Sequence, residues 1–123
     1  MMTALTAFNT EMENLKLNYE FGHMSKAPPD YPYWVGDYTE SEPLTEDGME
    51  IATILLTGFS RGKYVELEQQ KNIIKDYFKH EKIVNLDGAA VVFYFSGSLN
   101  IPVEDNDLKK CQINISVKMW KGR

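Results

Sequence analysis

The stretch "CQINISVKMW", residues 111–120, carries the clearest structural signal in the chain. Apolar and polar residues alternate along it, and a β-strand points successive side chains to opposite faces of its sheet. One face receives the apolar set: Cys111, Ile113, Ile115, Val117 and Met119. The other face receives the polar set and a terminal ring: Gln112, Asn114, Ser116, Lys118 and Trp120. The pattern predicts a strand that packs one face on a core and points Trp120 outward.

Four stretches upstream also have strand character, from alternation or from β-branched and aromatic content. They are residues 17–21, 33–42, 49–59 and 89–97. In the third, Ala52, Ile54 and Leu56 should face the core, while Thr53 and Thr57 face outward. Gly36 is a candidate β-bulge. The run 89–97 is almost wholly apolar, which predicts a central strand covered on both faces. Residues 98–110 are expected to form a polar connection.

Two stretches repeat their apolar residues at helical spacing. Thr3–Lys16 carries Leu5, Phe8, Met12 and Leu15. Tyr64–Lys79 carries an apolar stripe that is expected to be buried: Val65, Leu67, Ile74, Tyr77 and Phe78. The order of elements predicts an α+β fold: an antiparallel sheet of about four to five strands with two helices packed on one face. Residues 1–123 are expected to form a single domain.

Charge, hydropathy and cysteine content argue against several classes of protein. The formal net charge of −5 argues against a general nucleic-acid binder. Residues 27–60 hold seven acids and no base, so this third could face the mildly basic remainder of another copy. No apolar run is long enough to span a membrane, and the amino-terminal stretch lacks the basic region of a secretion signal. Cys111 is alone and is expected to be a buried thiol in a reducing compartment.

A search for reactive groups gives two weak candidates. "GFSRG", residues 58–62, matches the letters of a nucleophile elbow around Ser60, although a strand-to-helix turn needs its glycines for backbone reasons alone. The acidic pairs Glu40/Glu42 and Glu46/Asp47 offer carboxylates. No metal-ligand spacing or phosphate loop occurs. We therefore expect no catalytic, cofactor-binding or metal residues; a small α+β ligand-binding or hydrolytic domain that uses Ser60 or the acids is the alternative.

The order of motifs carries a resemblance over most of residues 30–121. "YPYWVGDYTESEP" is followed by "EDGME", by "ATILLTGFSRG" leading into "VELEQQKNIIKDYF", and by the long closing stretch from Gly88. This resembles the tail terminators and related neck proteins of long-tailed bacteriophages. The resemblance implies a non-enzymatic α+β protein that forms a ring, commonly a hexamer, on the end of the tail tube and joins it to the head. DNA passes through such a ring without specific binding.

From this resemblance we expect a virion protein, made in the cytoplasm of the bacterial host, whose partners are copies of itself, the tail tube and head–tail connector proteins. It needs no cofactor. Another tail or capsid component of the same build is a further possibility. Large rings with polar edges and nearby charges suit an interface. The expected interface residues are Tyr31, Trp34, Tyr38, Glu40, Glu42, Glu46, Asp47, Arg61, Lys63 and Trp120. For Trp34, a place in the core is the competing interpretation.

Overall fold

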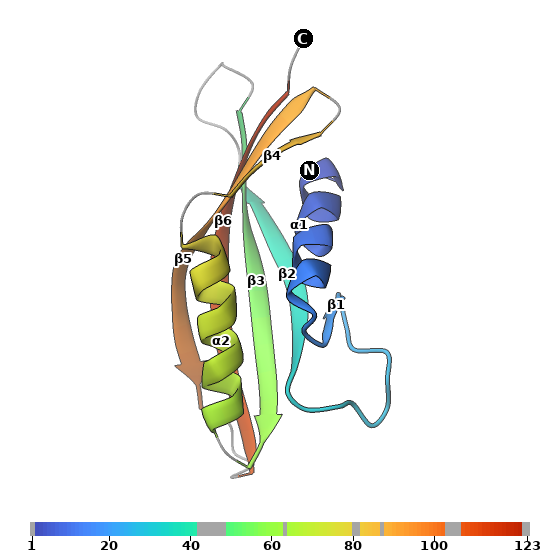
Figure 1. The fold of residues 1–123 in the computed structure, drawn as a ribbon, viewed down its shortest axis with the longest axis vertical. Coiled ribbons are helices and arrows are strands. Elements are labelled where there is room, and N and C mark those ends of the chain that lie inside the picture. Colours follow the sequence, from blue (N-terminus) through green and yellow to red (C-terminus); the bar gives the residue numbers. More distant parts are fainter. Residues whose placement is uncertain are drawn as a thin grey trace.

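The computed structural model describes residues 2–41, 49–62, 64–79, 82–86, 88–102 and 107–121. Within these ranges six strands form one sheet in the order β1-β2-β3-β6-β5-β4. Both helices lie on the same face of the sheet (Figure 1). The elements are α1 (Met2–Leu15), β1 (Tyr19–Phe21), β2 (Tyr33–Ser41), β3 (Met49–Arg61), α2 (Tyr64–Phe78), β4 (Lys82–Leu86), β5 (Ala89–Ile101) and β6 (Leu108–Lys121). The expected α+β class, with its two helices on one face, is confirmed.

The centre of the sheet is the antiparallel pair β3 and β6, which stay in register from Met49 opposite Trp120 to Arg61 opposite Leu108. The alternation in the sequence sets the faces correctly. Ala52, Ile54 and Leu56 are buried, as are the five apolar residues of β6 from Cys111 to Met119. The face that these residues share, which the helices cover, is called the helical face below; the opposite face is the open face.

Three phenylalanines join the helices to the sheet. The ring of Phe8 in α1 lies 5.6 Å from that of Phe78 in α2 and 5.7 Å from that of Phe93 in β5, centroid to centroid. The Tyr77 hydroxyl donates a hydrogen bond to the Glu11 carboxylate, which ties α2 to α1. Burying three large rings together stabilises this two-layer arrangement through lost apolar surface and ring–ring contact.

The helix predictions hold with one exception. Leu67, Ile74 and Phe78 are buried as expected, whereas Val65 is 58% exposed. Each residue turns an α-helix by about 100°, so Val65 lies about 200° around the helix from Leu67 and points to solvent. The inclusion of Val65 in the buried stripe was therefore wrong.

The sheet is larger than expected, and it is mixed. β1 pairs with β2 in parallel, while the other described pairs are antiparallel. β4 was not predicted. β5 continues to Ile101, and β6 already begins at Leu108, so most of the expected polar connection 98–110 is strand.

Two local expectations were wrong. β5 is not covered on both faces: Val91 and Phe93 are buried, but Val92 and Tyr94 are partly exposed on the open face. Gly36 is not a bulge, because the register of β2 with β3 runs through it unbroken. A Cβ atom at Gly36 would lie 2.6 Å from the Tyr19 hydroxyl oxygen. Glycine therefore makes room at this position for a ring from the neighbouring strand.

Candidate assembly interface

The open face of the sheet combines polar and apolar side chains. Thr53, Thr57, Gln112, Asn114 and Ser116 lie on it as predicted, all partly exposed. Ile51, Leu55, Phe59 and Val92 lie among them and are also partly exposed. No helix of the described ranges covers this face (Figure 1). It therefore offers mixed, partly apolar surface of the kind found at protein interfaces.

Three aromatic rings lie in contact at one end of the open face. Tyr31, Tyr33 and Phe59 form what we call the aromatic ladder, with successive ring centroids 5.3 and 4.9 Å apart. The Arg61 guanidinium lies 5.4 Å from the centroid of the Tyr31 ring, and the Lys110 ammonium lies 5.5 Å from that of Phe59. These are cation–π distances, so the contacts hold both cations against the ladder.

A hollow of about 550 Å³ opens beside the aromatic ladder. The ladder residues Tyr33 and Phe59 form part of its wall, with Thr57, Asp37 and Lys110 from the strands. The remaining wall is the loop after β1, which contributes His23, Met24, Lys26 and Pro29 among others. Rings, one carboxylate and basic side chains thus surround a single depression on the open face.

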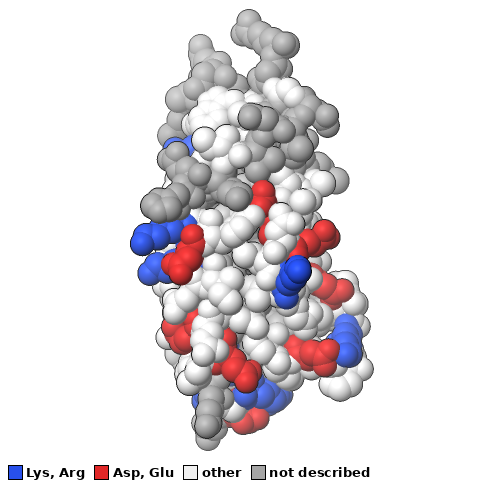
Figure 2. All heavy atoms as spheres, in the orientation of Figure 1, with Lys and Arg blue, Asp and Glu red and all other residues white. Residues whose placement is uncertain are grey.

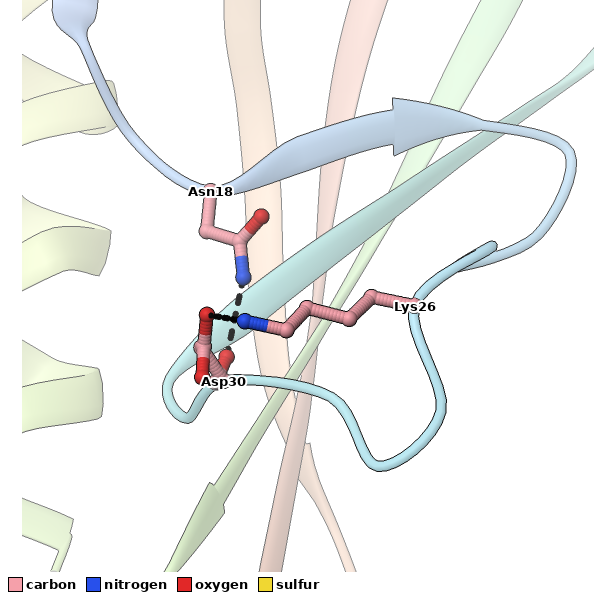
Figure 3. Close-up of polar contacts among 3 residues, drawn as sticks. All are labelled: Asn18, Lys26 and Asp30. Atoms are coloured by element: carbon pink, nitrogen blue, oxygen red, sulfur yellow. Dashed lines mark hydrogen bonds and ion pairs between the residues drawn. The ribbon is translucent and has the colours of Figure 1, made fainter.

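The loop that walls the hollow is fixed by polar contacts at both ends. Figure 3 shows the Lys26 side chain reaching across the loop to the Asp30 carboxylate, with an Nζ–Oδ2 distance of 2.6 Å. The Asn18 amide donates to the Asp30 carbonyl oxygen at 2.9 Å. The Ser25 hydroxyl donates to Glu20 at 2.6 Å, and this bond is the largest cause that lowers the pKa of the Glu20 carboxyl. The hollow is therefore a preformed feature.

Trp34 was wrongly placed at the interface. Its side chain is fully buried on the helical face, and its Nε1–H donates to Gln70 Oε1 of α2 at 2.8 Å. The competing interpretation, a core residue, is correct. Alternation had set Trp34 and Tyr33 on opposite faces of β2, but it did not show that the helices cover the Trp34 face.

The other expected interface residues fall into separate groups. Tyr31 and Arg61 are brought together at the aromatic ladder. Tyr38 and Glu40 are exposed at the far end of β2, on the helical-face side. Trp120 is partly exposed on the open face, opposite Met49 and remote in register from the ladder. Glu42, Glu46, Asp47 and Lys63 lie outside the described residues.

Three residues of the site were missing from the expected set: Tyr33, Phe59 and Lys110. Tyr33 and Phe59 are cross-strand partners of β2 and β3, and Lys110 is the partner of Phe59 in β6. Each belongs to a strand that the sequence predicts, or to its extension. Their meeting depends on the register between strands, which the alternation of a single strand does not specify.

Ser60 does not lie on a nucleophile elbow. It belongs to β3, pairs in register with Lys109 of β6, and is 1% exposed. An elbow instead presents its serine on a sharp exposed turn. Among the described residues, no cluster of three or more His, Cys, Asp or Glu side chains could hold a metal ion.

Charges on the helical face are intermixed. In Figure 2, basic and acidic side chains alternate over this face without forming a patch of one sign. On the same face, Lys71 pairs with Glu68 at 2.7 Å. Exposed charges of mixed sign add little to stability, although the Lys71 side chain in this pair is only 16% exposed.

Cys111 behaves as a buried apolar group, and this can be tested directly. Burial raises the pKa of the Cys111 thiol to about 11. At pH 8 its thiolate fraction is then on the order of 200-fold below that of a free cysteine, so alkylation by iodoacetamide should be slowed by at least that factor. Mass spectrometry of native and urea-unfolded protein would measure it. Equal rates in the two states would contradict the burial of this strand.

None of the helices in the described ranges is long and apolar enough to cross a bilayer. Comparison with protein-family models finds no match, and no curated protein matches in sequence.

Proposed function

We propose that the protein is a structural component of a bacteriophage or prophage virion, similar to a tail terminator. It forms a ring at the end of the tail tube and joins the tail to the head. The observation that carries the proposal is the open face with its aromatic ladder. Both helices lie on the opposite face, so apolar groups such as Ile51, Leu55 and Val92 remain partly exposed there.

The aromatic ladder suits a contact surface on energetic grounds. Tyrosine and arginine are over-represented among residues that dominate binding energy. Tyr33 already stacks on Phe59 and packs against the tilted ring of Tyr31, and Arg61 already lies over Tyr31. A partner would therefore order few side chains on binding, and less conformational entropy would be lost.

The resemblance and the fold point the same way. An α+β subunit with its helices on one face of a sheet is what the resemblance implies, and the protein has that architecture. The partners are copies of the chain, the tail tube and the head–tail connector proteins, and the protein acts in the virion without a catalytic step. The acidic segment 37–50 would either line the DNA path, where it would repel the passing phosphates, or contact a neighbouring subunit.

The test uses purified protein and tail tubes that lack their terminal protein. We expect closed rings by electron microscopy and tubes of fixed length capped at one end. Tyr31→Ala should weaken tube binding at least tenfold, as expected for an interfacial ring. Ile73→Ala, which removes an exposed apolar side chain from α2, is the control and should bind normally. A protein that neither forms rings nor binds tubes would contradict the proposal.

The alternative is a small ligand-binding domain, and the hollow is the observation in its favour. Its volume of about 550 Å³ is within the range of small-molecule sites. It is lined by Tyr33 and Phe59 together with His23, Asp37 and Lys110. A ligand screen by thermal shift would test this: a compound that stabilises the wild-type protein but not Phe59→Ala would favour the alternative.

A further inference from the structure

Among the described residues, the outermost strands pair with only part of each neighbouring strand. β1 pairs only with Trp34, Val35 and Gly36 of β2, and β4 pairs only with residues 89–93 of β5. Within the described residues, no strand pairs with the outer side of Asp37–Ser41 in β2 or of Tyr94–Ile101 in β5. We call the first the acidic edge and the second the uncharged edge. They belong to the two opposite lateral edges of the same sheet.

Hydrogen bonds reveal which backbone groups of the acidic edge point outward. The Trp34 N–H donates to the Asn18 carbonyl at 2.8 Å, and the Gly36 carbonyl accepts from the Gly22 N–H at 2.8 Å. Both groups face the β1 side. Since backbone polar groups alternate from side to side along a strand, those of Tyr38 and Glu40 face the same way, beyond the end of β1. The Tyr38 backbone N–H donates to the side-chain Oδ1 of Asp37 at 2.8 Å. This N–H therefore does not bond to a neighbouring strand.

The uncharged edge lacks two of the usual protections of a free strand, charged residues and proline. Natural edges carry charges, proline, bulges or a covering element that discourage pairing with another chain. Residues 94–101 contain no charged residue and no proline. A bulge lies between Phe95 and Gly97, but beyond it Ser98, Leu99 and Asn100 are all exposed, and Leu99 is 49% exposed. A strand of this length and composition is suited to pairing with another strand.

Charges beside the two edges match face by face. On the acidic edge, Asp37 projects on the open face and Glu40 on the helical face. Beside the uncharged edge, Lys118 Nζ lies 5.8 Å from the Tyr94 ring centroid on the open face. Lys75 Nζ lies 5.7 Å from the Phe95 ring centroid on the helical face. In a sheet continued with Thr39 opposite Leu99, Glu40 would lie opposite Ser98, close along the helical face to Phe95 and Lys75. Asp37 would share the open face with Lys118 at a greater distance, opposite Ile101.

We propose that the acidic edge of one copy pairs with the uncharged edge of a second copy, so that the sheet continues across the contact. The pairing is antiparallel, because β2 and β5 run in opposite directions within the sheet. The second copy keeps the same orientation but is shifted along the strands, which brings Thr39 of one copy opposite Leu99 of the other. The contact is heterologous, since two different surfaces meet, and such contacts close into rings or run on as filaments. The inference rests on the proposed function in that it supplies the contact by which the ring is built.

Disulfide trapping between two single variants tests the pairing. Thr39→Cys and Leu99→Cys place thiols on the open face of the two edges, while Cys111 stays buried in both. After mild oxidation, a mixture of the two variants should give a crosslinked dimer. The double variant should give a series of crosslinked multimers. Wild-type protein and Thr39→Cys alone should give none. Dimers from Leu99→Cys alone would indicate that the uncharged edge pairs with itself, and this would overturn the proposal.

A proline variant tests the role of the backbone. Glu40→Pro removes an outward N–H without affecting the hydrogen bonds between β2 and β3. It should lower the yield of the mixed crosslink roughly fivefold or more, the effect of a lost hydrogen bond. Glu40→Gln keeps the N–H and should lower it less. Unchanged circular dichroism would show that both variants fold; an unchanged crosslink in Glu40→Pro would overturn the proposal.

The two proposals can fail separately. Rings seen by electron microscopy without the mixed crosslink would overturn the edge pairing and leave the proposed function intact. The mixed crosslink in a protein that does not bind tail tubes would support the edge pairing and contradict the proposed function. A protein that remains monomeric and uncrosslinked at millimolar concentration would overturn the edge pairing.

Discussion

Trp34→Ala should lower the free energy of unfolding by about 3–5 kcal/mol, the range for removing a fully buried large ring. Trp34 is completely buried between the sheet and α2, and its indole N–H donates to Gln70. The variant would create a cavity and remove this hydrogen bond. The melting temperature should fall by roughly 10–20 °C in a domain of this size. Urea unfolding followed by circular dichroism measures the effect without depending on tryptophan fluorescence.

Trp120→Ala is the matched control for this experiment. Its ring lies partly exposed on the open face, so its loss should destabilise the isolated protein by less than half as much. If Trp120 contributes to assembly, the control should instead weaken the binding of partners. Equal destabilisation by the two variants would contradict the assignment of Trp34 to the core.

Gly58→Ala should lower the free energy of unfolding by about 1–3 kcal/mol, although it adds only one methyl group. Gly58 faces Trp34 across the β2–β3 pair, and the Trp34 ring lies directly over it. A Cβ atom at Gly58 would come within 2.6–2.8 Å of three ring carbons. The Trp34 ring is fully buried, so β3 or the indole can make room only by disturbing the surrounding packing. Denaturant unfolding would measure the loss.

Gly97→Ala makes the same chemical change where no atom lies within 4 Å of the added group. It should leave stability unchanged or raise it slightly, because alanine restricts the unfolded chain. A larger loss from Gly97→Ala than from Gly58→Ala would contradict the close packing of Trp34 on Gly58. Gly58→Ala should cost less in a Trp34→Phe background than in the wild-type protein, since the smaller ring leaves room for the methyl group.

Strand faces and helix positions followed from periodicity. The β6 pattern was confirmed at every position from Cys111 to Trp120, and α2 begins at the expected Tyr64. Periodicity depends on local geometry alone, so a single sequence can reveal it. The short β4 and the extension of β5 to Ile101 were missed. β4 has only five residues, and residues 98–101 of β5 are half polar, so neither gives a long periodic pattern. The strand conformation of both depends on pairing with distant residues.

The candidate site was harder to predict, because it depends on contacts between strands. Tyr31 and Arg61 were expected at an interface but not as partners of each other. Tyr33 and Phe59 meet because of the β2–β3 register, and Lys110 joins them only through β6. Trp34 was also misplaced because its environment depends on contacts between elements. Alternation gives each residue a face, whereas which face is covered depends on where the helices pack.

The position of β6 in the sheet has a consequence for how the protein emerges from the ribosome. β6 follows the other five strands in the chain, yet it lies between β3 and β5. Until its residues have been translated, β3 cannot complete its pairing, and the nascent hairpin of β2 and β3 presents an apolar edge. During this interval the chain is exposed to wrong associations, so chaperone binding or slow synthesis should affect its yield more than its final stability.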